Sequence, residues 1–450
     1  MARRKCTIHA SGVFSLFSAL SFAARTHEPD RIVFFDFNHI FGGKSGFLNV
    51  VSPVLDFFSV SHENVTYLTN INDAIERCSS IYTPDGSRVV FAESLQSKDN
   101  QQLIRKIGPQ ELHFYAEGAM SYGPIRDGLP DDITRILKAV HYVAHSPLEP
   151  IACEQFHITP SPISQSDWRN TLERFFDLLD RDFRDLTEID AFLASAPTNP
   201  VCVVHQNLSA ISKFPRMMEG RVFKDIVSRS LESLDLPVLV FLHPKIRYSY
   251  KDIFSTKDPR VVFAAPSFPF SEYYISRINA AAVVGVFSTA LLNLHDLGLP
   301  VTTLHTETVG NNIPHPEDSN IYALHYCQIV LRSFYSRQDL APGRTPNELA
   351  SLIRFRHDVR CEEIDKRLWH LPYALHNSKI FARNKIQYAE DYASLGGLVE
   401  TPAFRRVPKE RISFLSIMRM KGSQRIYSHA RNKLGRTVRD YKKKIKAAFR

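Results

Sequence analysis

Several features are missing from this sequence. The six cysteines are scattered, with no C-x-x-C pair and no histidine cluster beside them, which argues against a structural zinc site or a disulfide framework and favours a reducing compartment. No stretch approaches the roughly 20 apolar residues of a transmembrane helix, and neither low-complexity tracts nor repeats of solenoid length occur. What is present is 450 residues, 44% hydrophobic and 23% charged, a composition typical of a globular protein with two domains.

The net charge of +9 is concentrated at one end of the chain. Residues 404–450 contain 16 lysines and arginines against two acids, which is +14 and leaves about −5 for residues 1–403. A nucleic-acid enzyme usually carries positive charge across the working face of its fold, so no nucleic-acid partner is expected. Because apolar residues are mixed with the basic ones, 404–450 is predicted to be an amphipathic tail on an anionic membrane surface. A disordered, solvated charge run and a contact with a polyanionic glycan are the alternatives.

The N-terminus has two interpretations. Arg3-Arg4-Lys5 and the apolar residues 12–20 have the basic start and hydrophobic stretch of a signal peptide. Alternatively, residues 6–10 form a strand, Ser11-Gly12 a turn and the apolar stretch a buried helix, as at the start of a Rossmann-like domain. The scattered cysteines favour the second interpretation and a cytoplasmic location.

Short β-branched or aromatic runs alternate with helical stretches along the first 195 residues, and the alternation begins again at residue 201. This pattern predicts βαβ units and parallel sheets. The expected strands are Thr7–Ala10, Arg31–Phe37, Val65–Leu68, Arg88–Ala92 and Leu112–Ala116 in the first half, and Val201–His205, Pro237–Leu242, Arg260–Ala264, Ala281–Val286 and Val301–Leu304 in the second. A helical stretch at 168–195 and the sequence Ala196-Pro197-Thr198-Asn199-Pro200 separate the two series.

The predicted fold is therefore α/β of the GT-B type, in which two Rossmann-like domains face each other across a cleft. We expect an N-terminal domain at 1–197, a C-terminal domain at 198–403 with crossover helices near 366–392, and the basic tail at 404–450. Ligands of open α/β sheets bind beyond the carboxyl ends of the strands, so the cleft is the expected site.

Three short motifs stand at the carboxyl ends of predicted strands. They are Glu117-Gly118 in the first half, and His243-Pro244-Lys245 and Ser288-Thr289 in the second. Each dipeptide also occurs elsewhere in the chain, but those copies do not follow a predicted strand. The position of the three motifs in the fold, in this order across two domains, therefore makes them candidate site residues.

These motifs resemble those of the bacterial sialyltransferases and capsule polysialyltransferases, which carry an acid-acid-Gly motif, then His-Pro, then Ser-Ser/Thr. The resemblance covers roughly residues 5–310, because His205-Gln206-Asn207 and Pro269-Phe270-Ser271-Glu272 also match family positions. One departure is Ala116, where many members of the family have a second acid. The resemblance implies transfer of a sialic-type sugar from a CMP-activated donor to a glycan or glycolipid acceptor, with the acceptor bound by the N-terminal domain and the donor by the C-terminal one.

The same resemblance implies roles for individual residues. Glu117 would be the general base that takes the acceptor proton, and His243 would donate to the departing phosphate. Ser288 and Thr289, at a helix N-terminus, would bind that phosphate, since such termini favour anions.

The remaining residues of the motifs would complete the donor site. Glu272 would accept hydrogen bonds from the ribose, and Lys245 would add positive charge near the phosphate, with Gly118 and Pro244 as the neighbours that shape the site. Neither a metal ion nor another cofactor is expected.

Simpler explanations exist for each motif. Glu117 would cap a turn or pair with Arg126, His243 would be satisfied by backbone groups, and Ser288-Thr289 would be only a helix N-cap. For the whole chain, the alternatives are a nucleotide-sugar epimerase of similar fold and a non-catalytic scaffold in envelope assembly.

Overall fold

The structure is a computed structural model of the chain. It describes residues 3–303, with Val309, Ala323, Cys327 and Leu331, apart from gaps at 38, 83–88, 96, 124, 126–127, 146–149, 183–186, 196–198, 209–215, 235, 244–257 and 265–267. Three sets of predictions therefore lie outside the described residues: those for Pro244 and Lys245, for the crossover helices near 366–392, and for the tail at 404–450.

The first half of the chain folds around a parallel sheet in the order β3-β2-β1-β4-β5-β6-β7. Its strands are β1 (Arg4–Ala10), β2 (His27–Phe35), β3 (Val65–Leu68), β4 (Val89–Ala92), β5 (Glu111–Tyr115), β6 (Leu137–Ala144) and β7 (Thr159–Ser164). The second half has a parallel sheet in the order β10-β9-β8-β11-β12. Its strands are β8 (Val201–Val204), β9 (Val238–Phe241), β10 (Val261–Ala264), β11 (Ala282–Gly285) and β12 (Val301–Thr303).

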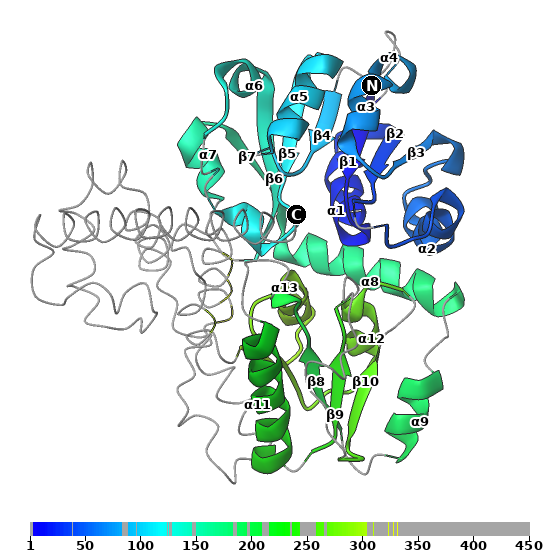
Figure 1. Cartoon of the computed structure of the whole chain (residues 1–450), viewed down its shortest axis with the longest axis vertical. Coiled ribbons are helices and arrows are strands. Elements are labelled where there is room, and N and C mark those ends of the chain that lie inside the picture. Colours follow the sequence, from blue (N-terminus) through cyan, green and yellow to red (C-terminus); the bar gives the residue numbers. More distant parts are fainter. Residues whose placement is uncertain are drawn as a thin grey trace, which may run out of the picture.

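Both sheets share the Rossmann arrangement, in which the third, second, first, fourth and fifth strands follow one another. Figure 1 shows the two units stacked with one long helix lying between them. The structure thus has the predicted GT-B fold. It contains every one of the ten predicted strands, with ends that differ by four residues at most.

Helices connect the strands of both units. In the first unit they are α1 (Val13–Ala23), α2 (Lys44–Phe57), α3 (Ile71–Glu76), α4 (Cys78–Ile81), α5 (Lys98–Ile107), α6 (Asp131–Ile136) and α7 (Ile151–Phe156), with the short 3-10 helices η1 (His62–Asn64) and η2 (Ala119–Tyr122). They are followed by α8 (Gln165–Asp182), α9 (Thr187–Ser195), α11 (Arg216–Leu234), α12 (Ser271–Arg277) and α13 (Thr289–Asp296). Within the described residues, no helix has the length and apolar character needed to span a membrane.

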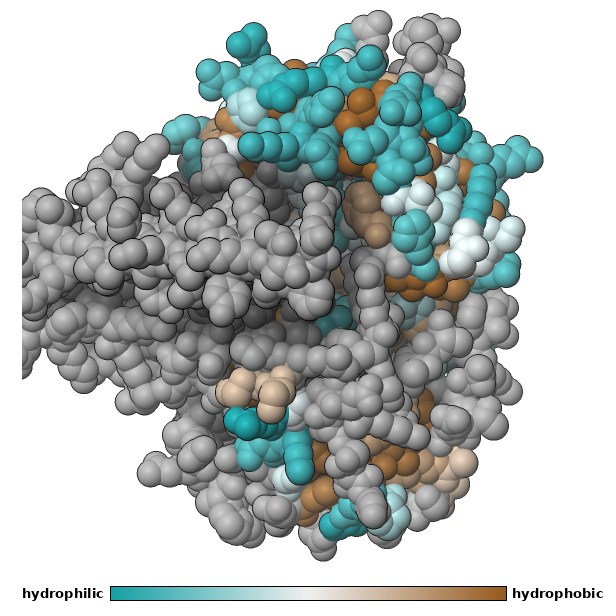
Figure 2. Space-filling view, in the orientation of Figure 1, coloured by the Kyte–Doolittle hydropathy of each residue, from teal (hydrophilic) through white to brown (hydrophobic). Residues whose placement is uncertain are grey.

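Local sequence explains where these helices lie. In α5, Ser97 caps the first turn and Gly108 ends the helix in the left-handed region at φ 64°, as expected for a serine N-cap and a glycine C-cap. By contrast, α1 has no charged residue and is buried almost throughout. The apolar N-terminal stretch thus forms the first buried helix of the fold. On the face of the first unit that Figure 2 shows, hydrophilic residues predominate, with hydrophobic ones among them.

One hydrophobic core runs through both units. The ring centre of Phe17 in α1 lies 4.7 Å from that of Phe175 in α8 and 5.6 Å from that of Phe270, which precedes α12. Trp168 of α8 is fully buried and stacks on Phe22 at 6.5 Å. Apolar packing of this kind between domains opposes their relative motion.

A buried hydrogen bond between a histidine and an aspartate also joins the units. Nδ1 of His145, just after β6, lies 2.6 Å from Oδ2 of Asp296 at the end of α13. The amide of Gln165 in α8 donates to the other carboxylate oxygen at 2.5 Å. Burial would raise the pKa of Asp296, but His145 and His295 beside it bring that pKa down to about 2. The carboxylate is therefore ionised at neutral pH.

The alternating pattern does not predict β6 and β7. Pro160 and Pro162 in β7 are unfavourable for a strand, yet they lie opposite Val140 and Tyr142 of β6. Since β7 is the edge strand and has a neighbour on only one side, the missing proline N–H groups do not interrupt the sheet.

Candidate active site

A cavity of about 330 Å³ lies where the carboxyl ends of the two sheets face each other. Loops after β1, β2 and β5 of the first unit form one wall, and segments after β8, β9, β10 and β11 form the other. Six of the eight predicted site residues line this cavity: Glu117, Gly118, His243, Glu272, Ser288 and Thr289. The remaining two, Pro244 and Lys245, lie outside the described residues.

The strand order explains why a cavity forms here. In both sheets the order in which the parallel strands are added reverses beside the first strand of the unit, between β1 and β4 and between β8 and β11. The connections on either side of such a point leave the sheet in opposite directions, which opens a crevice at its carboxyl edge. Residues after β1, β8 and β11 line the cavity, so it lies over both of these points.

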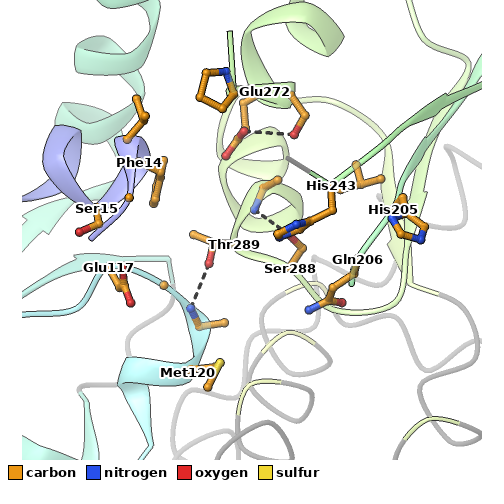
Figure 3. A pocket seen from close by; sticks show the side chains of 18 of the residues that line it. Phe14, Ser15, Glu117, Met120, His205, Gln206, His243, Glu272, Ser288 and Thr289 are labelled. Atoms are coloured by element: carbon orange, nitrogen blue, oxygen red, sulfur yellow. Dashed lines mark hydrogen bonds between the residues drawn. The ribbon is translucent and has the colours of Figure 1, made fainter. Parts of the chain in front are cut away.

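Glu117 stands on the first-unit side of the cavity (Figure 3). The backbone N–H of Ala116 still donates to His141 of β6 at 2.8 Å, so Glu117 is the first residue beyond the ladder. The neighbouring Tyr115 is fully buried, and its hydroxyl donates to the carbonyl of His9 at 2.6 Å. Burial, and then the nearby carboxylates of Glu93 and Glu117, raise the pKa of Tyr115 well above its usual range.

The role of Glu93 is not apparent from the sequence. It follows β4 as Glu117 follows β5, and it is buried. The hydroxyl of Ser15 in α1 donates to Glu93 at 2.5 Å and lies 3.0 Å from the Tyr115 hydroxyl. Ser15 lines the cavity, so the buried Glu93 orients the Ser15 hydroxyl at the cavity wall. A strand-terminal acid is the signal by which it could have been found.

Gly118 lies against the second unit with no room for a side chain. A Cβ atom at this position would lie 2.4 Å from Oγ1 of Thr289 in α13. The same hydroxyl accepts a hydrogen bond of 3.2 Å from the backbone N–H of Ala119. The structure therefore places Thr289 against the first unit, where its oxygen contacts the backbone beside Glu117.

Ser288 is the N-cap of α13, and its hydroxyl accepts from the backbone N–H of Ala290 at 3.2 Å. This is the simpler role that such a residue has at any helix start. However, the N-terminus it caps opens into the cavity. The unpaired N–H groups and the dipole of a helix favour an anion there, so the two roles are compatible.

His243 follows β9 on the second-unit side. The backbone N–H of Leu242 is bonded to Ala264 at 2.9 Å, so the ladder ends one residue before His243. In Figure 3 its imidazole lies next to Ser288, and Thr289 stands between these residues and Glu117. A carboxylate and an imidazole thus face one cavity from opposite units.

Glu272 lies in the first turn of α12 and is 6% exposed. Asn293 donates to its Oε1 at 2.8 Å, and Ser271 donates to its Oε2 at 3.3 Å. Asn293 in turn accepts from the indole N–H of Trp168 at 3.0 Å. Burial raises the pKa of Glu272, which these hydrogen bonds oppose. The side chain is therefore held rigidly at the cavity wall by a chain of contacts that starts in α8.

Two further parts of the wall were not assigned individual roles from the sequence. His205, after β8, is buried with its Nε2 3.4 Å from Oε1 of Glu219, a residue of α11. On the other side, the carboxylate of Asp36 accepts from the backbone N–H groups of Ile40 and Phe41 at 3.0 and 3.2 Å. Asp36 thereby holds the loop that contributes Ile40 and Phe41 to the cavity.

No family model matches the chain, and no curated protein matches its sequence. In structure it is similar to an α/β-galactoside α-2,3-sialyltransferase from Photobacterium phosphoreum, at 11% identity and a TM-score of 0.40 over 69% of this chain and 96% of that one. A putative UDP-N-acetylglucosamine 2-epimerase from Listeria monocytogenes has 10% identity and a TM-score of 0.42 over 83% and 96%. A glycosyltransferase from Rickettsia africae has 10% identity and a TM-score of 0.39 over 87% of this chain and 99% of that one. At these values the likenesses assign no activity.

Proposed function

We propose that the chain is an inverting glycosyltransferase, which moves a nonulosonic, sialic-type sugar from its CMP donor to a glycan acceptor in cell-surface polysaccharide synthesis. One observation carries the proposal. A carboxylate from one unit (Glu117) and an imidazole and a helix N-terminus from the other (His243, Ser288) line a single cavity between the carboxyl ends of both sheets. Transfer of a sugar from a phosphate leaving group to a hydroxyl requires groups of these kinds.

The proposed chemistry is a single displacement. Glu117 takes the proton of the acceptor hydroxyl as its oxygen attacks the anomeric carbon from the face opposite CMP, which inverts the configuration. The bond from the anomeric carbon to the phosphate oxygen breaks, and His243 donates a proton or a hydrogen bond to that oxygen. The N-terminus of α13 at Ser288 stabilises the negative charge of the phosphate. A positioned base typically contributes about 10²–10⁴-fold to the rate.

The proposal extends to partners and location. The first unit would bind the glycan or glycolipid acceptor and the second would bind the CMP-sugar, without a metal ion in the reaction and without nucleic acid as a partner. The enzyme would work in the cytoplasm on the inner face of the membrane, held there by the basic residues of 404–450. Each basic residue near an anionic surface contributes about 1 kcal/mol.

The first test is ligand binding. We expect CMP, at about 100 times its dissociation constant, to stabilise the protein by about 2.7 kcal/mol and so raise its melting temperature, with UMP giving a smaller shift. His243→Ala should reduce the CMP shift, whereas Glu117→Gln should retain it. His62→Ala, at an exposed position in η1, is the matched control and should behave as the unchanged protein.

The second test is turnover. CMP-sugars with different nonulosonic acids are incubated with a panel of glycan acceptors, and CMP release is measured. Glu117→Gln should lower kcat by about 10²–10⁴-fold, as expected for loss of a general base. Absence of both CMP binding and CMP release would refute the proposal. Conversion of a UDP-sugar without any acceptor would instead identify an epimerase, and a cellular phenotype unaffected by Glu117→Gln and His243→Ala would indicate a scaffold.

A further inference from the structure

A cluster of two histidines and a glutamate lies at the edge of the first sheet that is opposite the cavity. His27 is the first residue of β2, and Glu111 and His113 are the first and third residues of β5. One ligand atom from each of these three residues lies within 4.8 Å of the other two. The rings of His27 and His113 are 5.2 Å apart at their centres. Because these residues stand at the amino ends of parallel strands, the cluster is separate from the candidate active site.

His113 has one ring nitrogen bonded and one that is not. Its Nδ1 lies 2.9 Å from Nε2 of His141 on the neighbouring strand β6. Its Nε2 is buried and has no hydrogen-bond partner in the described part of the chain, although Oε2 of Glu111 lies 3.8 Å away. A buried polar atom without a partner costs about 1–3 kcal/mol, so this nitrogen requires an explanation.

The tautomers of His113 point to a cation. In one tautomer, Nδ1–H donates to His141 and the Nε2 lone pair faces the Glu111 carboxylate. Two electron-rich groups then oppose each other unless a positive ion lies between them. In the other tautomer, Nε2–H points toward Glu111, but 3.8 Å is too long for a hydrogen bond. The first arrangement is typical of a metal-binding histidine, whose other ring nitrogen is held by a neighbouring group.

We propose that His27, Glu111 and His113 bind a divalent transition-metal ion of the zinc type, with solvent completing its coordination. Two imidazoles and a carboxylate are a ligand set that suits Zn²⁺. Bonds of about 2.0–2.1 Å in a tetrahedron place the ligand atoms about 3.3 Å apart. The 3.8 Å pair therefore has to close by about 0.5 Å, and the other pairs, which lie within 4.8 Å, by at most about 1.5 Å. The Glu111 side chain is 26% exposed, which gives the ion access from solvent.

Neighbouring groups orient each of the three ligands. His141 contacts His113, the hydroxyl of Thr26 lies 2.8 Å from Nδ1 of His27, and Arg4 donates to Oε1 of Glu111 at 2.9 Å. Arg4 fixes the carboxylate, but its positive charge opposes that of the ion. Since the Arg4 side chain is 56% exposed, water screens this repulsion. The ion would connect the amino ends of β2 and β5 and stabilise the sheet, independently of the proposed transfer reaction.

The test uses the full chain after removal of metal with a chelator. Zn²⁺ is titrated by calorimetry, and the melting temperature is measured with and without it. We expect one Zn²⁺ per chain and a rise in melting temperature. Glu111→Gln should weaken binding by at least tenfold, whereas Arg4→Gln should strengthen it or leave it unchanged because a repelling charge is lost. His62→Gln, away from the cluster, should have no effect.

The variants are chosen because His113 is buried and its replacement can prevent folding. Glu111 and Arg4 are partly exposed, so their variants test the site in folded protein. The absorption spectrum of bound Co²⁺ supplies a second measurement, since its intensity reports how many ligands surround the ion. The proposal fails if Zn²⁺ does not bind, or if it binds with the same affinity to the unchanged protein and to Glu111→Gln.

Discussion

The substitution Gly118→Ala should show how much the contact between Gly118 and Thr289 contributes to stability and to turnover, because it removes no catalytic group. Gly118 has φ −172° and ψ −179°, an extended backbone that alanine adopts equally well. The effect of the substitution is therefore steric. The added Cβ would lie 2.4 Å from Oγ1 of Thr289 and 3.6 Å from its Cβ, so the hydroxyl has to move while the rest of the side chain can stay.

Moving that hydroxyl breaks the hydrogen bond from Ala119 to Thr289, a loss of about 1 kcal/mol. If α13 shifts as well, the strain of an overpacked site adds to this, and such sites cost about 1–3 kcal/mol. We therefore expect Gly118→Ala to lower the free energy of unfolding by about 1–3 kcal/mol. It should also reduce turnover, because the displaced Thr289 and the adjacent Glu117 both line the cavity.

The measurement is a double-mutant cycle in urea. Thr289→Ala removes the atom that the new Cβ would meet, so the double variant should be more stable than the sum of the two single effects by about 1 kcal/mol or more. Gly12→Ala is the matched control, since a Cβ there meets only Cβ of Ser15 at 3.8 Å. Strictly additive effects of Gly118→Ala and Thr289→Ala, or an equal loss from Gly12→Ala, would refute the reasoning.

Two further predictions concern stability. Burial lowers the pKa of His9 and of His113 to about 4 and that of His141 to about 3. Below pH 6.5 the unfolded chain therefore binds more protons than the folded one. The free energy of unfolding, measured by urea denaturation of chelator-treated protein, should fall on acidification by up to about 1.4 kcal/mol per pH unit for each histidine. A flat profile between pH 6.5 and 5 would contradict this. Asp296→Asn removes the buried carboxylate that His145 and Gln165 contact, so the free energy of unfolding should fall by about 1.5–3 kcal/mol. A loss below 1 kcal/mol would show that these hydrogen bonds contribute little to stability.

Much of the fold could be predicted because its strands are buried on both faces. Runs such as Val201–Val204 and Val238–Phe241 are entirely buried, and a parallel sheet requires such runs. The sequence Thr159–Ser164 has the opposite character, since it contains two prolines and only one buried residue. It forms a strand because β6 offers an open edge, which is a property of the assembled sheet rather than of the segment.

The candidate site was predictable to the extent that it follows strand ends. Glu117, His243 and Ser288 each come just after a strand, and parallel strands bring their carboxyl ends to one edge. The support beneath the site was not predictable, because Ser15 and Glu93 are 78 residues apart in the chain. The same holds for His27 and His113, whose proximity depends on how the sheet is assembled.

The shared core has a consequence for how the two units act together. Trp168 is buried between Phe14, Phe17 and Phe22 of α1, and its indole N–H holds Asn293, which holds Glu272 at the cavity wall. The same helix that packs the units together therefore also orients a carboxylate of the site. A change in the angle between the units would disturb apolar packing and this hydrogen-bonded chain at once. The spacing of the first-unit and second-unit groups across the cavity is thus coupled to the packing of α8.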